Sequence, residues 1–437
     1  MDETPAPKPK SLFRNRNFSL TFLGALVSNV ASLFYSFAVS FYILRITGNN
    51  ALIQGLYLAI GGVTFCVSTL FGGVIGDRFN KAKIMYICDY LKGAVIIGFT
   101  LLLMFVIHSE TGQVVALFIV AVLSNVLAGI FTPASAALLP QIVEEDRFQQ
   151  AQSYFSILNS FQSIFGVVLA GVMYTLVPIN TLFLIVGGCY IASAISEMFI
   201  RYEGIGEKRD EKLTLRATFR DIKEGFVYLS AIKPIMVLMV CILFINFFIS
   251  PVFDNFVPYF VATDLEGTQY LFHEAFAPEM WSSFLSMAIG IGSLVMGIVL
   301  STRKQMEKCN VVVRFSILAL AVIVGLLALF YGLFAGGTLP INSLLIIMLV
   351  GCVSIGVTLV LVNVPSSTAM MRIVDKDKFG KVSSVLNIGS QGLIPVATFL
   401  GGVALSSIGS VGLLGVCAGG LLVTALVLFF ARPIREL

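Results

Sequence analysis

Apolar stretches of 20 or more residues recur along the whole chain, and they constrain its fold more than any other feature. A helix of about 20 apolar residues crosses the roughly 30 Å hydrocarbon core of a bilayer. The mean hydropathy is +0.95, and only 12% of the residues are charged. Too few polar side chains remain to cover a surface that faces water. The sequence therefore predicts an all-α polytopic membrane protein.

Short polar or Gly/Pro-containing breaks divide the apolar sequence into twelve predicted transmembrane helices. These spans are expected near 18–44, 51–76, 83–107, 113–139, 148–177, 180–201, 234–262, 279–301, 310–334, 340–371, 379–405 and 408–431. A charged stretch separates the first six from the last six. The expected organisation is a tail at 1–17, a first half at 18–201, a linker at 202–233, a second half at 234–431 and a tail at 432–437.

The positions of the basic residues predict the orientation, because cytoplasmic loops collect lysine and arginine. With twelve spans, all of the 28 lysine and arginine residues except Arg45 and Lys92 fall in segments on one side. Both termini are therefore expected in the cytoplasm. No cleavable signal is evident, so the first span is expected to remain in the protein. The net charge of +4 reflects this topology, and no nucleic-acid partner is expected.

The linker is expected to contain an amphipathic helix. Its apolar residues recur at intervals of four and three, which places them on one helical face: Leu215, Phe219, Ile222, Phe226 and Leu229. Such a helix lies flat on the inner leaflet and would tether the two halves.

The two halves repeat each other in sequence. The stretch TPASAALLPQIVEEDRF at 132–148 matches VPSSTAMMRIVDKDKF at 364–379, with Pro133 opposite Pro365. Glycines 171 and 402 then stand at the same distance from the closing phenylalanines. Two parallel six-helix repeats are the signature of one transporter architecture, in which the halves are related by an axis along the membrane normal.

Three stretches carry a resemblance to a known family. The loop at 73–83, GVIGDRFNKAK, resembles the G-x-x-x-D-[RK]-x-G-[RK]-[RK] signature of the major facilitator superfamily, with Asn80 in place of the second glycine. GIFTPASAALLPQIV at 129–143 and FRDIKEGFVYL at 219–229 are similar to bacterial macrolide-efflux and enterobactin-exporter-like permeases. The resemblance covers nearly the whole chain, and it implies a secondary transporter that works by alternating access.

The sequence departs from related drug exporters at two positions. These exporters often place an arginine in the fourth span, where this chain has Ser124. They also tend to have Gly-Pro in the fifth span, where this chain has Gly166-Val167. The direction of transport and the coupling ion are therefore open at this stage.

The signature loop is interpreted as an inner gate. Its residues are Gly73, Asp77, Arg78, Asn80, Lys81 and Lys83. An acid at the membrane edge can cap helix N-termini of the other half or pair with its bases. Asn80 suits a turn. The alternative is a simple positive-inside anchor, to which Asp77 would add nothing.

Five charged residues are expected within or at the ends of spans. Asp89 and Lys92 lie three residues apart on one helix face, and a structural or gate-linked pair is favoured over substrate contact. Glu197 is interpreted as a rim residue that reaches for the interface. Asp254, flanked by prolines, is the candidate proton-coupling or cation-binding carboxylate. Alternatively, Asp254 is solvated at the outer rim or forms an outer latch with Arg45.

Polar residues within the spans must face protein or a watery cavity. The candidate cavity-lining residues are Asn29, Ser32, Tyr35, Ser36, Asn125, Asn159, Gln162, Asn246, Asn255, Asn387, Ser390 and Gln391. The 37 phenylalanines and 14 methionines favour an adaptable, greasy cavity. Small residues at 166, 171, 401 and 402 allow close helix packing, either as static contacts or as a seam on which the halves rock.

The sequence favours a secondary active exporter of amphipathic organic compounds, such as drugs, macrolides or siderophore-like molecules, driven by protons. The expected setting is a monomer in a bacterial cell membrane. The alternatives are an uptake facilitator, a lipid flippase or a non-transporting sensor. No nucleophile–base set, phosphate-binding motif or cysteine–histidine metal cluster is evident, so neither an enzyme nor a bound cofactor or metal is expected.

Overall fold

A computed structural model describes residues 12–144, 147, 151, 154–155, 158, 161–201, 226–227, 232–266, 268–270, 272–274, 276–302, 309–373 and 392–430. Every regular element in this part of the chain is a helix. A 3-10 turn at Leu12–Arg14 precedes the first long helix. The all-α prediction is confirmed for these residues.

The described part of the first half contains five long helices, four of which begin at polar caps. They are α1 (Arg16–Ile46), α2 (Ala51–Arg78), α3 (Lys81–Phe105), α4 (Glu110–Ile142) and α7 (Ile179–Met198), and the fifth span contains the π-helical turn η3 (Gln162–Gly166) followed by α6 (Val167–Leu176). The side chains of Asn15, Asn50, Asn80 and Ser109 accept hydrogen bonds from first-turn N–H groups. These short polar side chains explain why the helices begin where they do.

The second half begins with a helix that prolines disturb. Helix α9 (Lys233–Pro251) continues through η4 (Val252–Phe256), α10 (Val257–Phe260) and η5 (Val261–Leu265), of which η4 and η5 are π-helical. Pro251 and Pro258 have no N–H to donate, and the loss of these bonds accounts for the change in helical register. The remaining helices are α11 (Glu279–Thr302), α12 (Cys309–Ala335), α13 (Ile341–Ile373) and α15 (Ile394–Phe430).

Ten helices of the described chain are long and apolar enough to cross a membrane, and Val167–Leu176 is a shorter apolar helix. The long α15 is broken at Gly409, whose φ of 70° lies in the left-handed region, so the segments 394–408 and 410–430 are separate. The chain is a multi-pass membrane protein. The number twelve and the cytoplasmic position of the termini stay predictions, and most of the linker lies outside the described residues.

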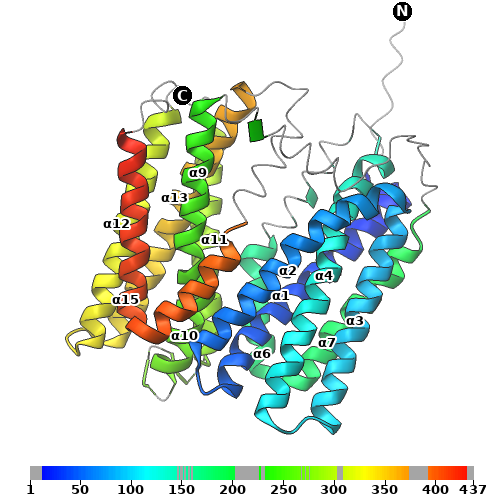
Figure 1. Ribbon diagram of the computed structural model, residues 1–437, viewed down its shortest axis with the longest axis horizontal. Helices are drawn as coiled ribbons and strands as arrows, with labels where there is room; N and C mark the ends of the chain where they lie inside the picture. The colour runs from blue at the N-terminus through cyan, green and yellow to red at the C-terminus, as the bar shows by residue number, and fades with distance from the viewer. Residues whose placement is uncertain are drawn as a thin grey trace, which may run out of the picture.

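The packing of helices repeats between the halves, as the sequence repeat predicts. In the first half α2 packs on α4 and α3 on α7, and in the second half α11 packs on α13 and α12 on α15. Figure 1 shows the two bundles side by side, with the start of α1 and the end of α15 at the same end of the molecule.

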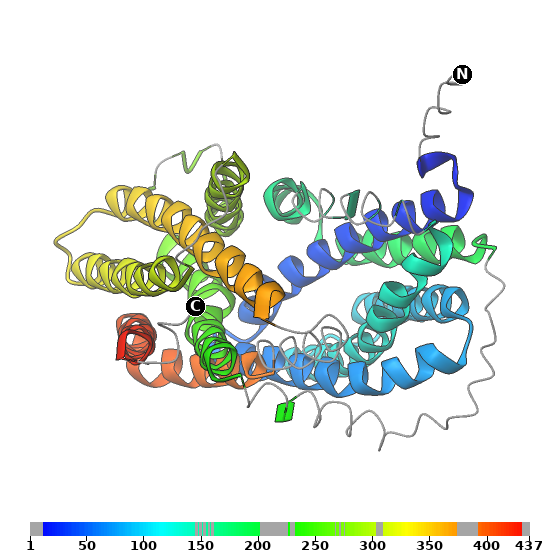
Figure 2. The ribbon, with the colours of Figure 1, turned by 90° about the horizontal axis from the view of Figure 1, so that it is seen from above.

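The described contacts between the halves concentrate at the other end, which is the outer side under the predicted orientation. There α2 packs on α15, α6 on α11, and α1 on α10, and Figure 2 shows α15 meeting α2 where the halves join. Phe41 and Ala51 of the first half are buried in the apolar core of the second half. The two halves are therefore closed against each other at this end, which is called the outer side below.

Glycines permit this closure. A Cβ atom added to Gly402 would lie 2.6 Å from the carbonyl oxygen of Ala51 and 2.9 Å from the Cα atom of Gly55. In the same way, a Cβ atom on Gly171 would meet the Ser283 hydroxyl of α11. Two of the four predicted seam residues, Gly171 and Gly402, thus lie at contacts between the halves, where a larger side chain would hold the helices apart. The other two, Gly166 and Gly401, lie against Leu33 and Pro251 of their own halves.

Candidate functional site

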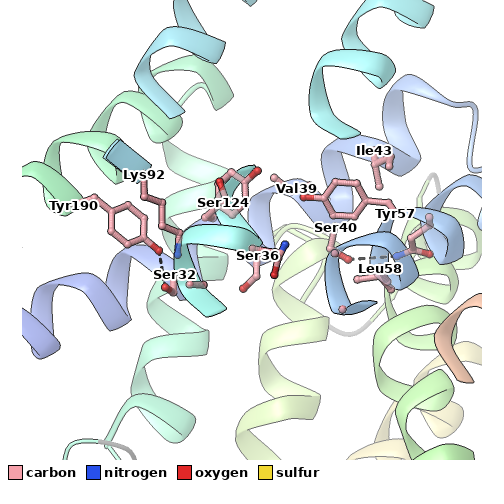
Figure 3. A pocket seen from close by; sticks show the side chains of 16 residues that line it. Ser32, Ser36, Val39, Ser40, Ile43, Tyr57, Leu58, Lys92, Ser124 and Tyr190 are labelled. Atoms are coloured by element: carbon pink, nitrogen blue, oxygen red, sulfur yellow. Dashed lines mark hydrogen bonds between the residues drawn. The ribbon is translucent and has the colours of Figure 1, made fainter. Parts of the chain in front are cut away.

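A cavity of about 240 Å³ lies within the first half and is lined mainly by α1, α2 and α4, with contributions from α3 and α7. Its polar lining residues are Ser32, Tyr35, Ser36, Ser40, Gln54, Tyr57, Lys92, Ser124, Asn125 and Tyr190. Figure 3 shows Lys92, Tyr190 and Ser32 at one end of this cavity and Ser40, Tyr57 and Leu58 at the other. Its wall therefore combines hydroxyl, amide and ammonium groups with aromatic rings, which suits an amphipathic ligand.

Lys92 supplies the positive charge of this cavity. Its Nζ atom lies 4.4 Å from the centre of the Tyr190 ring, within the range of a cation–π interaction. The Tyr190 hydroxyl is in turn 2.5 Å from Oγ of Ser32, so α1, α3 and α7 meet at this end. Ser124, where related exporters often have arginine, lines the same cavity. The positively charged side chain of this cavity thus comes from α3, whereas related exporters often have one on the fourth span.

Gln54 connects the cavity to the second half. Its Nε2 atom donates to Oγ of Ser40, 3.3 Å away, and to the backbone oxygen of Asp254, 3.4 Å away. Its Oε1 atom and the Ser124 hydroxyl are buried and have no hydrogen-bond partner among the described residues. Buried polar groups of this kind are normally satisfied, so both can bind a polar group of a ligand.

Sequence reasoning found part of this cavity. Ser32, Tyr35, Ser36 and Asn125 line it as predicted. Gln54, Tyr57, Ser124 and Tyr190 were missed as lining residues. The spacing along α2 could have indicated that Tyr57 and Gly61, one turn apart, share a helix face. Only the packing of α2 on α4 shows that this face lines the cavity.

The other predicted lining residues do not join this cavity. Gln162 lines a second, apolar cavity of about 450 Å³ between α1, α6 and α11. Asn255 is fully buried, and its Oδ1 atom would lie 3.0 Å from a Cβ atom on Gly401, so it packs against α15. Asn29 and Asn246 lie on α1 and α9 outside the lining of both cavities. Four residues lie outside the described chain: Asn159, Asn387, Ser390 and Gln391.

The structure describes part of the predicted inner gate. The Asn80 side chain caps α3 by accepting from the Lys83 backbone N–H at 3.2 Å, and its backbone is extended. Lys81 and Lys83 occupy the first turn of α3. Gly73, Asp77 and Arg78 lie in the last turns of α2, and their contacts lie outside the described part of the structure. The gate therefore stays a prediction.

Two predictions about charged residues are wrong. Asp89 and Lys92 do not form an ion pair, because Lys92 instead extends over the Tyr190 ring. Glu197 is not a rim residue, since its side chain is fully buried between α7 and α1. Its position next to the end of α7 suggests the membrane surface, but Gly24 leaves room for the carboxylate against α1.

Asp254 lies in η4 with an exposed side chain, close to the contact between the halves. No ion pair joins it to Arg45, and both residues are described. Because the outer side is closed in this structure, an outer latch between the two should be formed here, and it is not. Coupling or ligand binding at Asp254 stays a prediction. None of the described histidines, cysteines and acidic residues form a group that could hold a metal ion.

Two helical bundles that meet at one end, with a polar cavity among the membrane-spanning helices of the first bundle, have the architecture of membrane transporters built from two repeats. The sequence pattern of the Major Facilitator Superfamily matches residues 18–398. The chain therefore belongs to the major facilitator superfamily, a family of transporters and not of enzymes, as its signature loop indicated.

Two relatives describe its place in the family. The chain is 25% identical over 412 residues to an uncharacterized MFS-type transporter, YvqJ of Bacillus subtilis (strain 168), covering 90% of this chain and 87% of that protein. It is 26% identical over 224 residues to macrolide efflux protein A of Streptococcus pyogenes. That match covers 51% of this chain and 53% of the efflux protein, so it spans about half of each.

Solved structures agree on the fold. A bacterial homologue of the iron transporter ferroportin in an inward-facing state has a TM-score of 0.73 at 14% identity and covers 96% of this chain and 99% of its own. A D-xylose-proton symporter has a TM-score of 0.71 at 10% identity, with coverage of 98% and 99%.

Proposed function

We propose that this protein is a secondary active exporter of amphipathic organic compounds in a bacterial cell membrane, driven by protons and active as a monomer. The observation that carries the proposal is the mixed lining of the 240 Å³ cavity, where Lys92, Gln54 and Ser124 stand among tyrosines. Partial similarity to macrolide efflux protein A supports export and a drug- or macrolide-like substrate.

The test is transport of a compound panel in inverted membrane vesicles, with and without a pH gradient. The panel contains cationic, neutral and anionic amphipaths of similar size. Gradient-dependent accumulation of at least one of them in vesicles with the protein, and not in vesicles without it, supports proton-driven export. Transport that runs only toward the cytoplasm would contradict it and favour uptake.

A lipid flippase is the second candidate, and the apolar 450 Å³ cavity favours it. This cavity lies between α1, α6 and α11, and its lining includes Phe161 and Phe165, which are exposed. An acyl chain could occupy it while a headgroup reaches the polar cavity. Movement of a fluorescent phospholipid between leaflets, without transport of the compound panel, would favour the flippase.

Filling the polar cavity is expected to reduce transport. Ser36 lines the cavity and its hydroxyl bonds only to its own helix, donating to the Leu33 carbonyl at 3.2 Å. Ser36→Phe should therefore fold normally and reduce substrate affinity at least about tenfold, equivalent to about 1.4 kcal/mol. Ser406→Phe, at an exposed position of α15 outside this cavity, is the control. Equal transport by both variants would show that this cavity is not the substrate-binding site.

Neutralising Asp254 tests its role in coupling. If this carboxylate carries a proton, Asp254→Asn should abolish efflux driven by a pH gradient while substrate exchange without a gradient continues. Glu266→Gln is the matched control, because Glu266 is exposed just after η5. Full gradient-driven efflux by Asp254→Asn would exclude the coupling role.

A further inference from the structure

Two buried carboxylates lie together in the first half, away from Asp254 and behind the polar cavity. Asp89 of α3 is 4% exposed and Glu197 of α7 is 0% exposed. The two helices approach closely because a Cβ atom on Gly93 would lie 2.8 Å from the Gly187 carbonyl oxygen. Asp89 stands eight residues into α3, which places it about 12 Å from the start of that helix.

Contacts with Ser193 and Gly24 locate both acids at one point. A Cβ atom added to Gly24 would lie 3.2 Å from Oε1 of Glu197 and 3.4 Å from Oγ of Ser193. Oγ of Ser193 donates to the Gly24 carbonyl at 3.0 Å. Asp89 in turn interacts with Ser193 and repels Glu197 electrostatically. The two carboxyl groups therefore share one small site between α1, α3 and α7.

The carboxyl oxygens of this site lack partners. Both Oε atoms of Glu197 and Oδ2 of Asp89 are buried and have no hydrogen-bond partner in the described structure. A buried ionised carboxylate without donors is strongly unfavourable, and two that repel each other are more so. The unsatisfied oxygens thus point to a bound cation that the pair requires.

The charges around Asp89 and Glu197 indicate that the pair binds one proton. Lys92, one turn from Asp89, attracts its carboxylate and can offset a single negative charge. Cys88 and Tyr190 are the other titratable groups beside the pair. The charged residues of α1 are Arg16 and Arg45 at its ends, and that of α4 is Glu110 at its start, so none of these faces the site. One proton on the two acids leaves a single negative charge, and the positive charge of Lys92 makes the group neutral.

A proton fits this site better than a metal ion. Neither carboxylate lines the 240 Å³ or the 450 Å³ cavity, and both side chains are buried. A divalent ion such as Mg²⁺ or Ca²⁺ takes six or more oxygen ligands, and the pair offers fewer. A proton needs only one carboxylate oxygen, with which it forms an O–H bond.

We propose that Asp89 and Glu197 bind one exchangeable proton between them, and that it leaves or enters through the end of the cavity where Lys92, Tyr190 and Ser32 meet. Proton binding converts one carboxylate to a carboxylic acid, and release restores the carboxylate. The use of this proton for transport rests on the proposed function, whereas its binding does not.

Infrared spectroscopy of the full-length protein in liposomes tests the binding directly, with no substrate present. A pH titration in sodium-free buffer should show the carbonyl band of a protonated carboxyl group that disappears at alkaline pH. Glu197→Gln should remove this band and Asp89→Asn should shift it, because each changes how the proton is shared. Glu110→Gln, at an exposed position, is the control and should leave it unchanged.

Two results would overturn the proposal. One is the same titrating band in Glu197→Gln and the wild type. The other is a carboxyl signal that responds to added sodium at constant pH, which would make the ligand Na⁺. Lys92→Met gives an independent check if Glu197→Gln does not fold. Without the nearby cation the band should persist to a higher pH, and an unchanged titration would also contradict the shared site.

Discussion

Gly402→Val is expected to reduce transport strongly by weakening closure of the outer side. The added side chain would meet the Ala51 carbonyl and the Gly55 backbone of α2, at positions where backbone atoms cannot move aside cheaply. Overpacking of this kind costs about 1–3 kcal/mol. Because the contact between α2 and α15 joins the two halves, that cost weakens the outer-closed state by about 5- to 150-fold. Labelling of cysteines placed on the outer side should increase.

The control for this substitution lies in the second segment of α15, at 410–430. A Cβ atom on Gly419 meets nothing within 4 Å, and the residue is exposed. Gly419→Val should therefore retain transport near the wild-type rate. Equal loss of transport in both variants would mean that the loss does not depend on the contact with α2, and the closure argument would fail. Gly55→Val should behave as Gly402→Val does, since it lies on the opposite side of the same contact.

Asp77→Asn is expected to reduce transport strongly for the opposite reason. If Asp77 holds the inner side closed in the outward-facing state, its attraction stabilises that state and not the inward-facing one. Neutralising Asp77 therefore destabilises only the outward-facing state. The equilibrium then shifts toward the outer-closed state seen here. Expression should stay near normal, and cysteines placed on the cytoplasmic side of the cavity should label more. Asp77→Glu, which keeps the charge, should retain part of the transport, and unchanged transport by Asp77→Asn would exclude the gate.

The long helices and their order could be predicted because hydropathy and polar caps act locally. The helices capped by Asn50 and Asn80 begin at residues 51 and 81, where the spans were expected from 51 and 83. The apolar runs leave no other fold in a bilayer. Gly402 was predicted in a seam between the halves, but its partner Gly55 was not. Nothing in the sequence around Gly55 shows that its face meets α15.

The site depended more on tertiary contacts. The position of Glu197 beside the end of its span suggests the membrane surface, and only the packing of α1 over α7 shows that it is buried. Lys92 and Asp89 share a helix face, which predicts a pair, yet the Tyr190 ring of another helix takes the lysine. Local spacing fixes which residues share a face, whereas the neighbour opposite that face decides each contact.

The central claim is that two halves alternate about a contact between α2 and α15 that closes the outer side. Spin labels at Leu52, in the first turn of α2, and at Ser407, near the outer end of the first part of α15, report this directly in liposomes. The distance distribution in the wild type should contain a short and a long population. Gly402→Val should keep the long population and Asp77→Asn the short one. A single distance that neither substitution changes would contradict alternating access in this protein.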